Sequence, residues 1–350
     1  MAAFSTKAIE LIDITTLSEA DWHQWRRKGI GGSDLAAIMG MSPWATARDI
    51  YRKKKGIKGA LDDEADRQNW VAKKVGHLLE PLVAEIFAYQ TGFVPFEIRK
   101  MFAHPDYPYM LANVDYFITL PDGRTAILEC KTSNNHAKEK WDDDAVPFNY
   151  ELQCRHYMAV MNVDVVFIAC LYGNNEGDFV WRRIERDMDF EADIIAVEKD
   201  FWLNHVLPSI EPPYTESGDL VLQSIRNHFG KANVNADEVE LPAYMVDSLS
   251  EYLSAKAQKS KAEKTVATLK EKMEKAQAVF IEGLGASCKA VCRSGDEKFI
   301  ITYNPVMMDE IDKDGLKANH PDIYDKYIKK QEKYRRLNVK KTTDKKEEAA

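Results

Sequence analysis

The stretch LANVDYFITLPDGRTAILECK, residues 111–131, decides the fold. Two short apolar runs, 114–120 and 125–130, flank the turn-forming triplet Pro121-Asp122-Gly123, so the pattern predicts a β-hairpin. The hairpin supplies two neighbouring strands of a sheet. The rest of the chain then has to provide the strands and helices that pack on it.

The hairpin also carries two carboxylates and one ammonium group. Asp115 lies early in the first strand, and Glu129 lies near the end of the second. Because side chains alternate between the two faces of a strand, Lys131 shares a face with Glu129 while Cys130 points into the opposite layer. Burying three charges together is costly unless a ligand compensates them, and Mg²⁺ with a phosphate oxygen would do so. The sequence therefore predicts a site for a divalent metal and a phosphate on this face.

The composition is that of a globular protein without a membrane span. The 350 residues are 45% hydrophobic and 30% charged, and no apolar run approaches the roughly 20 residues that cross a bilayer. The N-terminus lacks the basic start and apolar core of a signal peptide. Five scattered cysteines favour a reducing compartment over a disulfide framework. The net charge of −8 does not itself indicate a nucleic-acid binder, which would then need a local basic surface.

A short helix is predicted at residues 17–28, ending in Arg26-Arg27-Lys28 and followed by GIGGSD at 29–34. The glycines permit a tight turn and a close approach of the backbone to a ligand. Ser33-Asp34 would cap the next helix. Two interpretations stay open here: a well-capped helix after a polar turn, or an anion site built from arginines and a helix N-terminus.

A long amphipathic helix is predicted over residues 67–91, after an acidic stretch at 61–66 that is typical of an exposed loop. Its apolar residues recur at helical spacing: Val71, Val75, Leu78, Leu79, Leu82, Val83, Ile86 and Phe87. Glu80 lies within this stripe, and a lone glutamate in such a place most often faces solvent between the core positions. A strand near 97–102 then leads into the hairpin.

The segments after the hairpin complete an α/β pattern. Residues 148–162 are predicted to form a helix on which Gln153 and Tyr157, four apart, share a face. The continuous apolar run 164–174 is typical of a buried strand, and 179–187 is its expected antiparallel neighbour. This order predicts a mixed central β-sheet flanked by helices.

The chain is predicted to divide into a core, a linker and a C-terminal region. The α/β core would take residues 1–210, and proline and polar residues make 211–240 a linker. Residues 241–338 are expected to be helical with a β-hairpin, and the charged tail 339–350 to be disordered. The C-terminal helix carries a heptad-like apolar stripe: Ala262, Val266, Leu269, Met273, Ala276 and Phe280.

Five motifs together resemble the YqaJ-like viral recombinase nucleases, relatives of lambda exonuclease within the PD-(D/E)XK superfamily. Each motif alone is weak, but their order and their register with the predicted elements are specific. The resemblance covers roughly residues 15–205. It rests on GIGGSD at 29–34, GHLLEP with Glu80, Asp115, Glu129-Cys130-Lys131, and Gln153 with Tyr157. It implies a PD-(D/E)XK nuclease-like core, to which the C-terminal helix and β-hairpin are an appendage.

The resemblance also implies an activity and its partners. Family members are metal-dependent exonucleases that degrade linear double-stranded DNA from 5′ to 3′ and leave 3′ overhangs for phage-type single-strand-annealing recombination. The implied cofactor is Mg²⁺, with Mn²⁺ as an alternative. The implied partners are linear duplex DNA with 5′-phosphate ends, a single-strand annealing protein and further copies of the chain in a ring-shaped homo-oligomer. The implied location is the cytoplasm of a bacterial host cell, with no membrane partner.

The same resemblance assigns roles at the predicted metal site. Asp115 and Glu129 would bind the metal together with the backbone carbonyl of Cys130, and Glu80 would add a ligand from the preceding helix. Lys131 would position or deprotonate the attacking water and steady the charge that develops on the phosphate. Two carboxylates with a lysine suit metal-assisted phosphodiester hydrolysis.

A second group of residues is implied to hold the DNA. Gln153 matches the catalytic glutamine of the helix that follows the E-x-K strand, and Tyr157 completes a Q-x-x-x-Y pattern. Arg26, or Arg27 as the alternative, would hold the 5′-phosphate together with Ser33. Arginine offers paired donors to a phosphate, which would give the enzyme its direction.

Two rival functions are open. The nearest is a PD-(D/E)XK endonuclease of restriction or repair; its iron–sulfur relatives need four clustered cysteines, which this chain lacks. The other is a catalytically silent DNA-end-binding protein, which the complete Asp115, Glu129 and Lys131 set disfavours. Digestion of linear and circular DNA separates the three functions.

Overall fold

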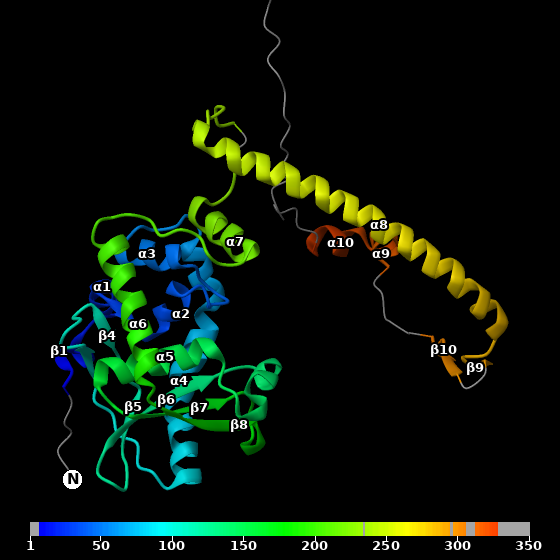
Figure 1. Ribbon diagram of the computed structural model, residues 1–350. Coiled ribbons are helices and arrows are strands. Elements are labelled where there is room, and N and C mark those ends of the chain that lie inside the picture. The colour runs from blue at the N-terminus through cyan, green and yellow to red at the C-terminus, as the bar shows by residue number, and fades with distance from the viewer. Residues whose placement is uncertain (1–6, 234, 295–296, 306–311, 328–350) are drawn as a thin grey trace, which may run out of the picture. The chain divides into compact units, whose positions relative to one another are not determined.

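The structure is a computed structural model that describes residues 7–233, 235–294, 297–305 and 312–327. The chain divides into two compact units, residues 1–235 and 236–350, and each is described by itself (Figure 1). Within the described residues, no helix combines the length and the hydrophobicity that a membrane crossing requires.

A mixed four-stranded sheet forms the centre of the first unit, as the sequence predicts. Its strands follow the order β5-β6-β7-β8. β5 pairs with β6 antiparallel, β6 with β7 parallel, and β7 with β8 antiparallel. The strands are β5 (Tyr116–Thr119), β6 (Thr125–Thr132), β7 (Val165–Leu171) and β8 (Phe179–Glu185). The parallel pair needs a crossover, and helix α5 (Phe148–Met161) lies within it.

The two faces of the central sheet pack against different helices. One face meets α4 (Asp62–Thr91) through Val83 and Phe87, and the other meets α5 through residues such as Met158. Phe87 is fully buried, and burying a side chain of this size contributes about 1.5–3 kcal/mol. By the alternation along β6, Glu129 and Lys131 belong to the face that meets α5.

A second, smaller sheet has the order β1-β3-β4-β2, and it is built from short segments far apart in the chain. Only β3 was foreseen, as the strand predicted near 97–102. β2 pairs with β4 in parallel, and Ile30 N donates to Tyr109 O at 2.6 Å. The pairing fixes the start of the glycine-rich segment. The strands are β1 (Ile9–Asp13), β2 (Ile30–Gly31), β3 (Lys100–Ala103) and β4 (Met110–Ala112).

Short helices surround this smaller sheet and cover α5. Helix α2 packs directly on α5, and α6 also contacts α5. The chain continues from α6 into one π-helical segment, Phe201–Val206. The helices are α1 (Glu19–Arg27), α2 (Gly32–Ile38), α3 (Ala47–Lys55) and α6 (Met188–Asp200).

Helix α4 differs from its prediction in two ways. It begins at Asp62, so the acidic stretch interpreted as a loop is helical in its backbone. Val71, Val75, Leu78 and Leu82, predicted as core, are 51%, 42%, 65% and 40% exposed. The reason is that α4 joins the apolar cluster on the sheet only from Val83 onward.

The predicted linker 211–240 contains a helix of the first unit, so it is not a linker throughout. Helix α7 (Gly218–Phe229) holds buried Ser224, whose Oγ donates to Asp49 Oδ1 at 2.6 Å. The amides of Ala60 and Leu61 donate to backbone carbonyls at the end of α7, each at 3.0 Å. These hydrogen bonds attach α7 to the core, and the boundary between the units falls at residue 235.

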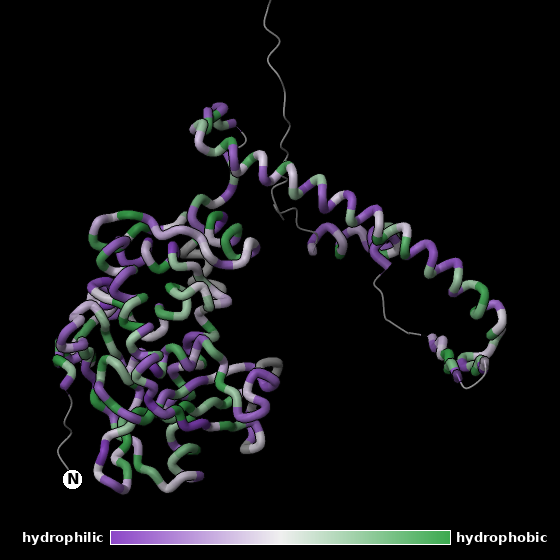
Figure 2. The backbone as a smooth tube through the Cα atoms, in the orientation of Figure 1, coloured by the Kyte–Doolittle hydropathy of each residue, from purple (hydrophilic) through white to green (hydrophobic). Residues whose placement is uncertain are grey.

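The second unit contains one long helix followed by a hairpin, in agreement with the predicted element types. Helix α8 (Val246–Leu284) has 39 residues, and Leu284 is its one buried residue. Figure 2 shows hydrophilic and hydrophobic residues alternating along it. The hairpin is β9 (Lys289–Ser294) with β10 (Glu297–Thr302), and α9 (Lys313–Asn319) and α10 (Pro321–Tyr327) follow. The predicted disordered tail 339–350 lies outside the described residues.

Candidate active site

The β5–β6 hairpin and helix α5 bring four of the predicted site residues into one hydrogen-bond network. Lys131 Nζ donates to Glu129 Oε1 at 2.5 Å and to Gln153 Oε1 at 3.0 Å. Gln153 Nε2 donates to Glu129 Oε1 at 2.7 Å and to Tyr157 Oη at 3.1 Å. Residues four apart on α5 therefore meet residues two apart on β6.

Asp115 completes this network from the residue just before β5. Its Oδ2 accepts a hydrogen bond from the Cys130 amide at 2.9 Å, which ties it to β6 beside Glu129. Burial raises the pKa of the Asp115 carboxyl group, although Lys131 opposes the shift. Burial and then the neighbouring Asp115 raise the pKa of Glu129. Burial disfavours the ionised form of both carboxyl groups, and a cation bound between them would stabilise that form.

One oxygen of Glu129 provides a direct test of whether a metal fits. Glu129 is 2% exposed, and its Oε2 has no hydrogen-bond partner among the described residues. A buried acceptor left unpaired costs about 1–3 kcal/mol, more when it is charged. Coordination to a hard cation would satisfy this oxygen, and oxygen donors are what Mg²⁺ and Mn²⁺ prefer.

Glu80 of α4 is the third carboxylate at this site. It is half-buried, and burial, followed by Asp115 and Glu97, raises its pKa to about 7. Glu80 is therefore electrostatically linked to Asp115 rather than an independent surface residue. No three His, Cys, Asp or Glu side chains in the described part of the chain already form a metal cluster. Asp115 and Glu129 are therefore the best candidates for holding an ion. Glu80 is near enough that, beyond burial, the Asp115 charge raises its pKa.

The side chain of Cys130 lies in the opposite layer from Glu129 and Lys131, as predicted. Its side chain packs against the cluster on the α4 face, and burial raises the pKa of the thiol well above its ordinary value. Its backbone amide is held by Asp115 on the other face. The thiol is therefore a packing group, and the backbone amide is the part of Cys130 that contacts Asp115.

A second cluster forms where α1 meets α2. One nitrogen of the Arg26 guanidinium, Nη2, donates to Ser33 Oγ at 3.1 Å and to Asp34 Oδ2 at 3.4 Å. Arg27 is exposed, and its guanidinium lies near Gly56 instead. The structure therefore places Arg26, and not Arg27, beside Ser33. Helix α2 has only seven residues, so its N-terminus alone does not make an anion site.

Asp34 and Lys54 form an ion pair behind Arg26. Lys54 Nζ donates to Asp34 Oδ2 at 2.6 Å and to the Arg26 carbonyl at 3.0 Å. The Gly31 amide also donates to Asp34 Oδ2, at 2.9 Å. Burial would raise the pKa of Asp34, but Lys54 and Arg26 outweigh burial and hold it below its ordinary value. Asp34 thereby remains charged and fixes Arg26 in place.

Two polar residues near the site were missed in the sequence. The Lys54 side chain is only 5% exposed, although it lies in a basic run typical of a solvated face. The available sequence signal was apolar Ile50, four residues earlier on the same helical face, and the structure shows that Ile50 is buried. Asn113, two residues before Asp115, has a buried amide nitrogen without a hydrogen-bond partner among the described residues. Nothing in its sequence context distinguishes it.

The glycines of GIGGSD allow α2 to approach α5. A Cβ atom at Gly32 would lie 2.9 Å from both the Gln153 and Tyr157 side chains, and one at Gly31 would lie 2.7 Å from the Arg26 guanidinium. Real Cβ contacts do not come this close. The glycines therefore serve the close packing of α2 against α5 and Arg26, a role that neither of the two interpretations of the sequence included.

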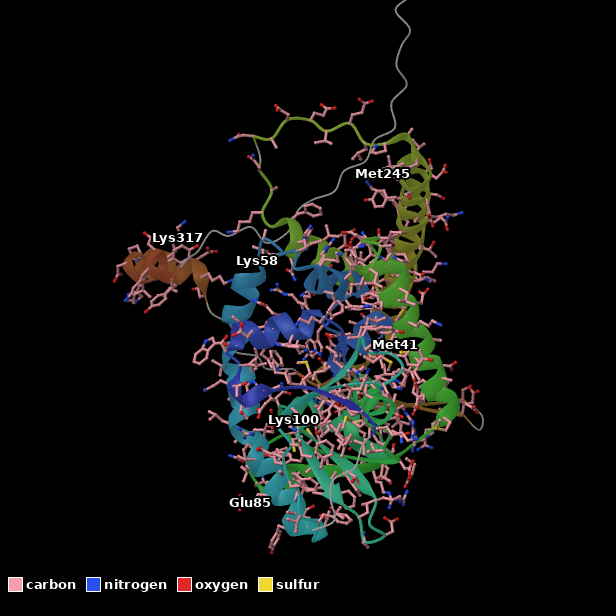
Figure 3. The ribbon with its side chains drawn as sticks, turned by 90° about the vertical axis from the view of Figure 1, so that its left-hand side faces the viewer. Met41, Lys58, Glu85, Lys100, Met245 and Lys317 are labelled. Atoms are coloured by element: carbon pink, nitrogen blue, oxygen red, sulfur yellow. The ribbon has the colours of Figure 1, made fainter. Side chains whose placement is uncertain are left out.

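One cavity connects the two clusters. It has a volume of about 230 Å³, and its wall includes Ser33 from the Arg26 cluster and Lys131 from the carboxylate network. The loop after α2, which runs past Met41 (labelled in Figure 3), forms one side of it. The remaining lining residues are Ala36, Ser42, Trp44, Asn149, Tyr150 and Gln153. A single extended ligand could therefore reach both clusters.

Comparison with known proteins identifies the family. Residues 21–164 match the YqaJ-like viral recombinase domain. Over 345 residues the chain is 30% identical to the uncharacterized protein YqaJ of Bacillus subtilis (strain 168), covering 97% of this chain and 99% of that protein. The chain belongs to the YqaJ-like viral recombinase family. The likeness to YqaJ includes the second unit, which is therefore a shared part of this YqaJ-like pair.

Among solved structures, the YqaJ-like chain is similar to an alkaline exonuclease, LHK-Exo from Laribacter hongkongensis. Its structure in complex with dAMP has a TM-score of 0.45 at 20% identity and covers 55% of this chain and 94% of that one. A second LHK-Exo structure has a TM-score of 0.42 at 19% identity, with the same coverage. These similarities are too low to transfer residue roles.

Proposed function

We propose that this chain is a metal-dependent exonuclease that degrades linear double-stranded DNA from 5′ to 3′ and leaves 3′ overhangs. The observation that carries the proposal is the convergence of Asp115, Glu129 and Lys131 on one sheet face, with Glu129 Oε2 left unpaired. Membership in a viral recombinase family supports DNA as the substrate. A 3′ overhang is what a single-strand annealing protein would use in phage-type recombination.

The proposed cofactor is Mg²⁺, with Mn²⁺ as the alternative. Asp115, Glu129 and the backbone carbonyl of Cys130 would hold it, and Glu80 would contribute from α4. When bound, such an ion polarises the phosphoryl oxygen and lowers the pKa of the attacking water. The orphaned Glu129 oxygen and the raised pKa of Glu80 support this donor set.

Lys131 would stabilise charge on the phosphate, and Gln153 would hold Lys131 in position. Burial would lower the pKa of Lys131, but Glu129 and Asp115 outweigh burial and raise it, so the ammonium stays charged. A fixed positive charge suits stabilisation of the negative charge that develops on the phosphate. Gln153 holds the orientation of Lys131 and Glu129 through two hydrogen bonds, and Tyr157 in turn holds the Gln153 amide.

We infer the direction of digestion from the two ends of the cavity. Arg26 with Ser33 would bind the 5′-phosphate, since arginine offers paired, charged donors to phosphate oxygens. The cavity extends from Ser33 to Lys131, so a nucleotide anchored at its 5′-phosphate would present its next phosphodiester bond to Lys131, the hydrogen-bond partner of Glu129. An enzyme anchored in this way starts at a 5′ end.

The experiment uses a linear duplex with either a 5′-phosphate or a 5′-hydroxyl end. In Mg²⁺ we expect loss of the 5′-ended strand, faster with the phosphate, and no digestion in EDTA or on closed circles. Cutting of supercoiled circles at a comparable rate would support an endonuclease instead. End binding without cutting would support a silent binding protein. The proposal includes a ring-shaped homo-oligomer on DNA, which a mass measurement in solution tests separately.

A further inference from the structure

An exposed tryptophan stands beside the cavity that joins the two clusters. The Trp44 side chain lines this cavity and is 76% exposed, on the loop between α2 and α3. An indole ring kept in water forgoes the free energy that its burial would yield. A ligand that covers the ring therefore gains binding energy from it.

Hydrogen bonds fix the conformation of the loop that carries Trp44. Ser42 Oγ accepts from the amide of Trp44 at 3.1 Å and from the next amide at 3.3 Å. The Met41 amide donates to the Ala36 carbonyl at 2.8 Å, which attaches the loop to α2. At the other end, Thr46 caps α3. A ring on a fixed loop loses little conformational entropy when a ligand stacks on it.

The rest of the cavity suits a nucleotide. Ser33 and Lys131 lie in its wall, and Asn149 offers an amide. The Lys131 ammonium lies 5.2 Å from the centre of the Tyr150 ring, so an aromatic surface and a cation share one wall. A sugar-phosphate that runs from Ser33 to Lys131 would leave its base near the exposed ring of Trp44. Phosphate, sugar and base would then each meet a matching surface.

We propose that the indole of Trp44 stacks on the nucleobase at the 5′ end of the DNA strand. This inference rests on the proposed function, because it takes the phosphates to lie at Ser33 and Lys131. Base–aromatic stacking tolerates every base, since each base has a π-face. Trp44 would therefore position the terminal nucleotide without making the enzyme sequence-specific.

The test compares two ends that differ only by a base. Binding of a 5′-phosphorylated duplex is measured in EDTA, with either a normal or an abasic nucleotide at the 5′ terminus. Trp44→Ala is expected to weaken binding of the normal end about tenfold, the scale of one stacked base, and to leave the abasic end unchanged. Trp44→Phe should retain most of the affinity. Because Trp44 is exposed, both variants should keep the thermal unfolding midpoint of the wild type.

Trp70→Ala is the matched control, because Trp70 is also exposed, at 61%, and lies on α4 outside the cavity. It should bind both ends as the wild type does. The kcat/KM of digestion in Mg²⁺ on the same two ends gives a second readout with the same expected pattern. Equal losses of Trp44→Ala on both ends, or no loss on either, would overturn the stacking. If the wild type still digests linear DNA in that case, the proposed function stands; if it neither binds nor cuts, both proposals fail.

Discussion

Lys54 Nζ lies 2.6 Å from Asp34 Oδ2, although the two residues lie on different helices and are 20 positions apart in the sequence. The pair is nearly closed to water, with the Lys54 side chain 5% exposed. Asp34 also contacts the Arg26 guanidinium that reaches Ser33. The proposed 5′-phosphate site is thus supported by a buried ion pair, which couples the stability of the fold to the position of Arg26.

Asp34→Asn should be strongly destabilising. Removing one partner leaves the Lys54 ammonium buried without its counter-charge, a change that typically costs about 3–5 kcal/mol. Urea unfolding followed by circular dichroism measures the loss. Asp193→Asn, on an exposed position of α6, is the control and should change the free energy of unfolding by less than about 0.5 kcal/mol. Similar values for the two variants would mean that the ion pair contributes nothing measurable.

The same pair predicts a pH dependence. The pKa of Asp34 is held below its ordinary value of 3.8, so its ionised form stabilises the folded state. That stability is fully present above the unfolded pKa and is lost as pH falls toward the folded pKa. The gap in unfolding free energy between wild type and Asp34→Asn should therefore be constant from pH 7 to about pH 5 and narrow below about pH 4. A gap that stays constant down to pH 3 would contradict the assignment.

Lys131→Ala should abolish cleavage while preserving DNA-end binding. The substitution removes the charge proposed to stabilise the phosphate, and the loss of an electrostatic catalytic group lowers the rate by more than about a hundredfold. Glu129 keeps its hydrogen bond from Gln153, so the network need not collapse. Single-turnover digestion and fluorescence anisotropy of a labelled end give the two readouts, with exposed Lys53→Ala as the control. Normal cutting by Lys131→Ala would reject the assignment of the β6 strand.

Arg26→Ala and its neighbour Arg27→Ala form a matched pair. Only Arg26 reaches Ser33, so only Arg26→Ala should reduce the preference for phosphorylated over hydroxyl ends. Hydrogen bonds to a charged group contribute about 1.5–3 kcal/mol, so the preference should fall about tenfold or more. The ratio of digestion rates on the two ends measures it. An unchanged ratio in Arg26→Ala, or an equal fall in both variants, would argue against this phosphate site.

The carboxylate network was predictable because its signals are local. A turn triplet between two apolar runs placed Asp115, Glu129 and Lys131 on one hairpin, and alternation put Glu129 and Lys131 on one face. A spacing of four put Gln153 and Tyr157 on one face of α5. The missing step was which face of α5 would meet which face of the sheet.

The remainder depended on contacts between distant segments. The two-residue strand β2 has no periodicity of its own and exists because Ile30 and Gly31 pair with β4. The Asp34–Lys54 pair likewise joins segments that no local pattern connects. For α4, the helical spacing of apolar residues predicted an apolar face but not the residue at which the sheet begins to cover that face. The prediction that Val75 is a core residue was therefore wrong. The prolines near α7 led to the prediction of a linker, because the hydrogen bond that attaches α7 to the core joins residues far apart in the sequence.

The attachment of α7 predicts where the chain can be shortened. A chain that ends at residue 235 keeps every described element of the first unit and should unfold cooperatively near the midpoint of that unit in the full-length protein. A chain that ends at residue 210 loses the Ser224–Asp49 hydrogen bond, the two amide bonds to the end of α7, and the 2.7 Å hydrogen bond from the Ala47 amide to Glu216 Oε1. Each lost bond leaves a group on α3 or on the segment before α4 unpaired, at about 0.5–1.5 kcal/mol apiece. Thermal unfolding of the two shortened chains should therefore give a clearly lower midpoint for the one ending at 210. Equal midpoints would show that residues 211–235 behave as the linker their prolines suggest.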